Sequence, residues 1–162
     1  MPFIEALVNR IEPGRALDLA CGMGRHSLLL ASHGWQVTAV DASQAAIDSI
    51  RAVDPRIESV HANLEKFEFN LEPDSWDLIC VCLYLQRGLF ESIRRGVRKG
   101  GRAVLANPMM DDREGVKPMN PHYLVSAGEL EREFSGWRIE HECETLANPP
   151  SRKIAELIAL KT

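Results

Sequence analysis

The sequence predicts a three-layer α/β sandwich in which helices cover both faces of a seven-stranded, mostly parallel sheet. Short apolar runs alternate with amphipathic helical stretches along the 162 residues, which is typical of βαβ units. The first apolar run leads straight into a glycine turn and a helix, the order in which open parallel sheets bind nucleotide-like ligands. The link between the last two runs, Glu144–Ser151, is too short for a crossover helix, so the last strand must be antiparallel.

The first half of the chain alternates helices and strands with recognisable ends. A helix opens the chain because Phe3 and later apolar residues recur at four-residue spacing, and Pro13-Gly14 ends it. Gly34 suits the position after the helix that follows the glycine turn, and Ser43 suits the N-cap of the next helix. The elements expected here are helices over residues 3–11, 25–33 and 43–54 and strands over residues 15–19, 37–41 and 57–61.

The second half contains the central strand and the longest loop. Trp76–Leu83 is a nearly continuous apolar run, as expected of a parallel strand covered on both faces. Met109–Tyr123 holds two prolines, a glycine and a charged cluster, which indicates a loop, and Ser126–Glu129 forms a capping box that starts a helix. The remaining elements expected are a helix over residues 87–99, a strand over 102–106, a helix over 129–134 and strands over 137–143 and 152–160.

Length, charge and cysteines restrict the class of protein. We expect one domain over residues 1–162, with a short N-terminal helix at 3–11. The formal net charge of -4 argues against a nucleic-acid partner. Neither a long apolar span nor a signal peptide is evident, so we expect a cytoplasmic protein with no membrane partner. The cysteines lack metal-ligand spacing; Cys80 and Cys82 indicate one face of a strand and not a redox pair, and no metal is expected.

The glycine turn and two acids point to the kind of ligand. Gly22 and Gly24 permit unusual backbone angles and close approach of a ligand, as in proteins that bind NAD, FAD or S-adenosylmethionine. Asp18 precedes the glycines, where a carboxylate would receive an ammonium and repel a pyrophosphate. Asp41 ends the next apolar run, where an acid accepts both hydroxyls of a ribose. A ribose with a cationic amino-acid tail satisfies both acids, although a solvated strand residue and a helix cap are the simpler alternative.

These residues carry a family resemblance. Arg15–Ser27 resembles motif I of the class I S-adenosylmethionine-dependent methyltransferases, with Asp41 as their acid after the second strand. Three further stretches resemble small bacterial methyltransferases of the tellurite-resistance type: Asp77–Ile79 with Tyr84–Arg87, Lys99–Gly101, and Asn120–Val125 leading into Gly128–Leu130. The resemblance implies S-adenosylmethionine as cofactor and S-adenosylhomocysteine as product.

The resemblance also implies a cofactor half at about residues 15–75 and an acceptor half at about 76–162. Two features depart from the family: the chain before the first strand is short, and Asn63 stands where an acid often binds the adenine amine. An amide oxygen accepts from that amine too, without charge assistance. The cofactor-binding residues expected are Asp18, Ala20, Cys21, Gly22, Gly24, Asp41, Ala42, Asn63, Leu64 and Cys82.

The acceptor side is less sharply defined. His26 lies in the first turn of the cofactor helix, whose positive end favours a neutral, basic imidazole. Tyr84 and Arg87 follow the central strand at the ligand-binding edge. We expect these three as catalytic residues, although His26 could lie on the surface or contact the cofactor, Tyr84 could belong to the core, and Arg87 could lie on the surface. Substrate-side candidates are Asn107, Met110, His122 and Tyr123.

The function predicted is methyl transfer from S-adenosylmethionine to a small molecule, because few residues lie beyond the core. Tellurite, selenite or a thiol as acceptor rests on the resemblance alone. Two alternatives remain open at this point. A module could bind the cofactor without catalysis, or the turn could belong to a dinucleotide-dependent oxidoreductase, which would leave Asp18, Ser27 and the antiparallel end unexplained. The sequence does not define the oligomeric state.

Overall fold

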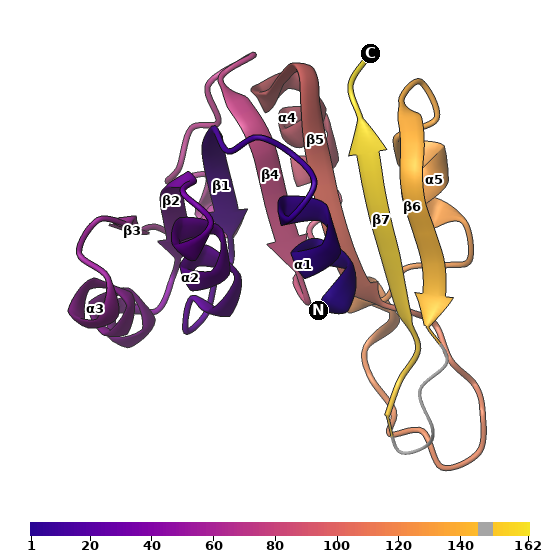
Figure 1. Cartoon of the computed structure of the whole chain (residues 1–162). Helices are drawn as coiled ribbons and strands as arrows, with labels where there is room; N and C mark the ends of the chain where they lie inside the picture. The colour runs from indigo at the N-terminus through magenta and orange to yellow at the C-terminus, as the bar shows by residue number, and fades with distance from the viewer. Residues whose placement is uncertain (146–150) are drawn as a thin grey trace.

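The chain forms one seven-stranded sheet with strand order β3-β2-β1-β4-β5-β7-β6 (Figure 1). The computed structural model describes residues 1–145 and 151–162. Strand β7 runs antiparallel to its neighbours β5 and β6, whereas the pairs among β1 to β5 are parallel. The predicted sandwich and the antiparallel last strand are therefore confirmed. Most of the short link on which that prediction rested, residues 146–150, lies outside the described residues.

Helices and strands alternate through the sheet's parallel part. The strands are β1 (Arg15–Leu19), β2 (Gln36–Asp41), β3 (Glu58–His61), β4 (Trp76–Cys82), β5 (Val97–Pro108), β6 (Arg138–Thr145) and β7 (Ile154–Leu160). The helices are α1 (Pro2–Val8), α2 (Arg25–Ser32), α3 (Gln44–Val53), α4 (Leu89–Gly96) and α5 (Glu129–Glu133), with short 3₁₀ turns η1 (Leu64–Lys66) and η2 (Pro121–Tyr123).

Two apolar layers hold the helices on the sheet. On one face Ile4 of α1, Leu30 of α2 and Ile50 of α3 pack in a single buried cluster with Leu78 and Cys80 of β4. A second cluster covers the opposite face and includes α4 and α5. It joins Leu89, Phe90, Ile93, Leu130 and Phe134 to the strand residues Leu17, Ile79 and Leu105. Because side chains alternate along a strand, β4 contributes Leu78 and Cys80 to one face and Ile79 to the other.

The turn between β1 and α2 is built as predicted, and its two glycines serve different purposes. Gly24 has φ +78°, and a Cβ there would lie 2.5 Å from Cγ1 of Ile50, so both backbone angle and packing exclude a side chain. Gly22 has φ +54°, and nothing lies within 4 Å of the position that its Cβ would take. The main chain at Gly22 is therefore open to a ligand.

Most predicted helix ends are confirmed, and two are wrong. Helix α1 ends at Val8 and not at Ile11. It therefore ends before Glu12, the residue whose helical conformation is disfavoured by Pro13. Helix α4 ends at Gly96 and not at Lys99. The reason is that Val97 pairs with Trp76 and is buried, which places Val97 and the residues after it in β5. A pairing across the sheet therefore overrides the local helical pattern.

The predicted caps are confirmed in part. Ser43 Oγ accepts the N–H of Ala46 at 3.3 Å and so caps α3. At α5, Glu129 accepts the backbone N–H of Ser126 at 2.9 Å, which is one half of the capping box. The other half is absent, because the Ser126 hydroxyl donates to the same carboxylate at 3.0 Å and the helix begins after Gly128.

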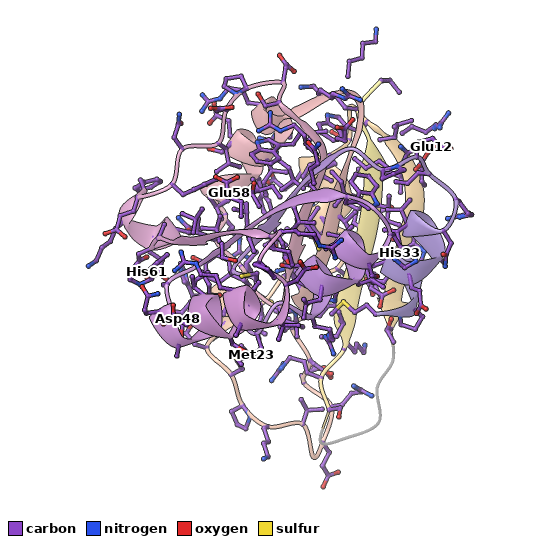
Figure 2. The ribbon with its side chains drawn as sticks, turned by 60° about the vertical axis from the view of Figure 1, so that its left-hand side comes forward. Glu12, Met23, His33, Asp48, Glu58 and His61 are labelled. Carbon is purple, nitrogen blue, oxygen red and sulfur yellow. The ribbon has the colours of Figure 1, made fainter. Side chains whose placement is uncertain are left out.

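The carboxyl ends of the parallel strands share one edge of the sheet, at the bottom of Figure 1. Figure 2 shows His61, at the end of β3, and Met23, in the glycine turn, toward this edge, with Glu12 and Glu58 toward the other. The segments that follow β1, β2, β3, β4 and β5 all emerge here. None of the helices in the described residues has the length and apolar character needed to span a bilayer.

Candidate functional site

A pocket of about 280 Å³ opens at the carboxyl edge of the sheet. The segments after four neighbouring strands, β1 to β4, build its wall. Its lining residues are Ala20, Asp41, Ala42, Ala62, Asn63, Leu64, Glu65 and Tyr84. Five predicted cofactor residues thus meet in one place, together with one residue expected on the acceptor side. A larger hollow of about 370 Å³, lined by residues such as Arg15, Trp35 and Glu58, lies toward the other edge and contains none of the predicted residues.

Asp41 connects the end of β2 to the glycine turn. One carboxylate oxygen accepts the N–H of Gly22 at 2.8 Å, and the other accepts the N–H of Ser43 at 2.8 Å. A carboxylate oxygen accepts two hydrogen bonds, so each oxygen of Asp41 keeps one direction for a further donor. The carboxylate is therefore oriented by backbone groups and still able to receive two hydroxyls.

The Asn63 side chain is oriented by the 3₁₀ turn η1 that follows it. Its Oδ1 accepts the backbone N–H of Glu65 at 2.9 Å, and the backbone N–H of Asn63 donates to the carboxylate of Glu68 at 2.8 Å. Leu64, the next residue, is buried and provides an apolar wall of the pocket. The amide oxygen of Asn63 retains one acceptor direction, whereas a carboxylate at this position would add charge.

Asp18 is a buried acid behind the glycine turn. It is only 1% exposed, and the hydroxyl of Ser27 on α2 donates to its carboxylate at 2.6 Å. Burial, the largest cause, and negative charge at Cys82 together raise the pKa of Asp18 from 3.8 to about 7 in spite of that hydrogen bond. Near neutral pH this carboxyl therefore lies at the point of ionisation, where a nearby cation would shift it to the charged form.

Two cysteines and a histidine gather next to Asp18. The Sγ atoms of Cys80 and Cys82 are 3.5 Å apart, and His26 of α2 lies over them. The hydrogen bond from Cys80 and the neighbouring His26 lower the pKa of Cys82 to about 6, while the same bond and burial raise that of Cys80 well above its usual range. The sequence analysis found no metal-ligand spacing because His26 comes from a distant helix.

Tyr84 lies between the pocket and the acceptor side. Its hydroxyl donates to Gln86 at 2.8 Å, and its backbone carbonyl accepts the side chain of buried Asn107 at 2.7 Å. Burial raises the pKa of Tyr84, and so do the charges of Glu65, Tyr123 and Asp41. Asn107 therefore holds the end of β4 against β5, and Tyr123 lies on the same side of the molecule as Tyr84.

Arg87 holds the long loop in place. Its guanidinium donates to both carboxylate oxygens of Glu129, at 2.7 and 3.1 Å, and to the carbonyls of His122 and Leu124 at 3.0 and 2.9 Å. Burial alone would raise the pKa of Glu129, but the hydrogen bonds from Arg87 and Ser126 hold it below its usual value. These contacts assign Arg87 a positioning role in this structure.

The other loop candidates are exposed. Met110 is 50% and Tyr123 is 45% exposed, and the rings of His122 and Tyr123 meet edge to face at 5.3 Å. They follow β5 at the carboxyl edge and so lie on the side where an acceptor would enter. Cys21, in the turn itself, is a neutral thiol, because burial and the charges of Asp18 and Asp41 raise its pKa to about 12.

Comparison with known proteins agrees with this geometry. The family model described as "Methyltransferase domain" matches residues 16–101, from β1 to the first residues of β5. That range contains the glycine turn, both acids and the pocket. The chain belongs to the methyltransferase domain family. It is a class I S-adenosylmethionine-dependent methyltransferase domain, which decides between this cofactor and the dinucleotides that the glycine turn left open.

Solved methyltransferase structures have the same fold. TehB from Haemophilus influenzae superposes with a TM-score of 0.86 at 20% identity, over 100% of this chain and 62% of that one. An S-adenosylmethionine-dependent methyltransferase from Mesorhizobium loti gives a TM-score of 0.76 at 20% identity, over 98% of this chain and 95% of that one. At this identity the likeness shows the shared fold and not a shared acceptor.

One curated relative matches a short stretch. Ribosomal RNA small subunit methyltransferase C from Alcanivorax borkumensis is 50% identical over 39 residues, which are 24% of this chain and 12% of that protein. The chain thus spans about an eighth of this relative and 62% of TehB. The match is confined to a small part of each protein and leaves the acceptor of this domain open.

The buried carboxyl of Asp18 predicts a pH-dependent stability. Its pKa is raised in the folded chain, so the stability it contributes is complete below pH 3.8 and is lost as the pH rises through about 7. Urea unfolding should therefore show Asp18→Asn gaining stability relative to the wild type between about pH 4 and about pH 7, with a constant difference above that range. The exposed Asp48→Asn is the control, with a constant difference. A constant difference for Asp18→Asn across that range as well would contradict the raised pKa.

The contacts of Arg87 predict that this residue protects the long loop. Arg87→Ala removes donors to Glu129, His122 and Leu124, so trypsin should cut after Arg113 several-fold faster than in the wild type, as mass spectrometry of the fragments would show. Arg95→Ala, at an exposed position of α4, the helix that follows Arg87, is the matched control. Equal cutting rates in the two variants would mean that Arg87 does not hold the loop.

Proposed function

We propose that this domain transfers the methyl group of S-adenosylmethionine to a small-molecule acceptor, with S-adenosylhomocysteine as product. The observation that carries the proposal is the pocket at the carboxyl edge, where Asp41, Asn63 and Tyr84 from separate strand ends face one space. We infer a single domain over residues 1–162, in which about 15–75 bind the cofactor and about 76–162 face the acceptor. Its four free cysteines favour the reducing cytoplasm.

The cofactor half offers a partner for each part of S-adenosylmethionine. Asp41 would bind both ribose hydroxyls, Asn63 would accept from the adenine amine, and Ala42 and Leu64 would contact the adenosine. Ala20, Cys21, Gly22 and Gly24 would form the turn beneath it, since the space over Gly22 is open. Asp18 would balance the ammonium of the methionine part, and Cys82 would lie beside that part. A positive ligand next to a carboxyl with a pKa of about 7 favours its ionised form.

On the acceptor side the protein has to orient the acceptor and exclude water from the site. When bound, the cofactor supplies an activated methyl group, so the residues of the chain need mainly to position the acceptor and exclude water. Tyr84 is the candidate for orientation, because its ring lines the pocket and its hydroxyl lies at 2.8 Å from Gln86. His26 is the candidate base if the acceptor arrives protonated. Arg87 acts through the loop that it holds.

A small acceptor fits the surroundings of the pocket. Met110, His122 and Tyr123 follow β5 on this side, and Asn107 is buried near the end of that strand. The four are an apolar, an aromatic and two neutral or weakly basic polar side chains. The chain carries a formal net charge of -4, which does not favour a phosphate backbone. The short match to a ribosomal RNA methyltransferase makes RNA the acceptor to test against this proposal.

The ribose role of Asp41 predicts a loss of cofactor affinity. Asp41→Ala should weaken binding of S-adenosylhomocysteine by about 1–3 kcal/mol, the scale for leaving hydrogen-bonding groups unpaired. Calorimetry with adenosine should show the same loss, because the ribose is the shared contact. Asp48→Ala, on the exposed side of α3 (Figure 2), should bind as the wild type does. An unchanged adenosine affinity in Asp41→Ala would show that Asp41 does not bind the ribose.

Turnover tests the acceptor side and the function together. Release of S-adenosylhomocysteine is measured against small thiols, amines, metalloid oxyanions and ribosomal RNA. With a small acceptor identified, Tyr84→Phe keeps the ring and removes the hydroxyl, so turnover should fall about 10-fold to 100-fold through misplacement of the acceptor while cofactor affinity is retained. His26→Ala should lower turnover of a protonated acceptor.

Three outcomes would contradict parts of this proposal. Full turnover in both Tyr84→Phe and His26→Ala would mean that the reactive side is misplaced, and Met110 and Tyr123 would be tested next. Turnover with ribosomal RNA alone would overturn the small acceptor. Binding of S-adenosylmethionine without release of product for any acceptor would indicate a binding module.

A further inference from the structure

Three soft ligand groups meet beneath the glycine turn. Cys80 and Cys82 lie two residues apart on β4, so their side chains share one face of the sheet, the face that α2 covers. His26 lies in the first turn of α2. One potential ligand atom from each of these residues lies within 4.8 Å of the other two. We name His26, Cys80 and Cys82 the HCC cluster.

The position of the HCC cluster follows from strand pairing. Asp18 of β1 pairs with Cys80 of β4 in parallel register, and Ser27 of α2 donates to Asp18 at 2.6 Å. That hydrogen bond holds the start of α2 against β1 and brings the preceding residue, His26, over the two cysteines. The cluster is therefore placed by the sheet and by a helix that packs on it, and not by a mobile loop.

One ring nitrogen of His26 lacks the hydrogen-bond partner that its burial requires, although the imidazole interacts with Cys82. His26 is only 7% exposed, and its Nε2 is fully buried with no hydrogen-bond partner among the described residues. A buried polar atom without a partner costs about 1–3 kcal/mol, so such atoms usually have a partner that completes them. Cys80 is completely buried and Cys82 half-buried, so the cluster is enclosed except on the side of Cys82.

We propose that the HCC cluster binds one thiophilic d¹⁰ cation, Zn(II) or Cu(I), through the two cysteine sulfurs and the imidazole of His26. The sulfur spacing fits. Two thiolates bound to one tetrahedral Zn(II) at about 2.3 Å lie about 3.8 Å apart, and the observed separation is 3.5 Å. Only small movements would bring the three atoms to one ion.

The donor set excludes the hard cations. Ca²⁺ and Mg²⁺ require six or more oxygen ligands, whereas the HCC cluster offers two sulfurs and one nitrogen. Thiolates select Cu(I) and Zn(II), and imidazole suits both. Cu(I) would be complete with three ligands, while Zn(II) would need a fourth. The Asp18 carboxyl pairs in register with Cys80 and interacts electrostatically with Cys82 and His26, which makes it a candidate for the fourth ligand.

A bound cation would act on the same turn that builds the cofactor site. It would tie α2 to β4 beneath Gly22 and Gly24 and so stiffen the turn. It would also occupy His26 and Cys82, so an acceptor requiring His26 as base would react more slowly with the metal-loaded protein. Cation binding itself does not depend on methyl transfer and is measured without cofactor or acceptor.

Cadmium is the probe, since Cd(II) bound to thiolates has a strong ultraviolet charge-transfer band. The full chain is reduced with a phosphine, freed of metal and titrated with Cd(II). We expect one Cd(II) per chain, displaced by Zn(II) or Cu(I) in separate competitions and not by Mg(II). Cys80→Ser should weaken binding at least about 100-fold, since even loss of an outer contact to a ligand costs 10–100-fold. Cys143→Ser, at an exposed thiol, is the matched control.

Second variants keep the test decisive. Circular dichroism and the melting temperature report whether each variant is folded, and Cys82→Ser replaces Cys80→Ser if the latter unfolds. His26→Gln should retain the sulfur band but lose affinity for Cd(II). The proposal is overturned if no band forms, if the band persists unchanged in both Cys80→Ser and Cys82→Ser, or if it is lost in Cys143→Ser. If methyl transfer is normal and no band forms, the cation site alone is rejected. If the band forms and no methyl transfer is found, only the proposed function is rejected.

Discussion

The hydrogen bond from the N–H of Gly22 to the carboxylate of Asp41 is the contact on which the site depends. It joins the turn after β1 to the end of β2 at 2.8 Å, and Ser43 holds the other carboxylate oxygen at the same distance. Parallel pairing of β1 with β2, with Leu19 opposite Val40, brings the two strand ends level. The acid is thus a structural acceptor for the turn and, in the proposed function, also the group that receives the ribose.

Several residues around this contact have energetically unfavourable burial or backbone angles. Asp18 is a buried carboxyl whose pKa burial raises to about 7, and Nε2 of His26 is buried without a partner among the described residues. Ala20 and Leu83 adopt positive φ angles of 53° and 60° directly after β1 and β4. Strained backbone and buried polar groups persist only where the surrounding packing enforces them, and they gather at functional sites. The four residues named here lie at the carboxyl edge, whereas Asp74, also at positive φ, and Trp35 and Trp76, whose indole N–H groups are buried without a partner among the described residues, lie at the other edge.

The acceptor side is built by a different principle. The glycine turn is held by sheet pairing and helix packing, whereas the Met109–Tyr123 loop is held by polar contacts, among them those of Arg152 with the carbonyls of Met109 and Lys117 at 3.1 and 2.5 Å. Met110 donates its N–H to the carbonyl of Val125 at 2.9 Å, and Arg87 grips the segment before α5. These contacts hold the backbone of the loop, and the side chains of Met110 and Met119 remain exposed.

The order of strands and helices, the glycine turn, the two acids and the cofactor class could be predicted from the sequence, because hydrophobic period, turn residues and caps act over a few neighbouring positions. The end of α4 could not, since Val97 leaves the helix to pair with Trp76 across the sheet. The anchoring role of Arg87 and the meeting of His26 with Cys80 and Cys82 were likewise decided by tertiary structure alone. Each joins residues distant in the chain, and only strand register and helix packing bring such residues within bonding distance.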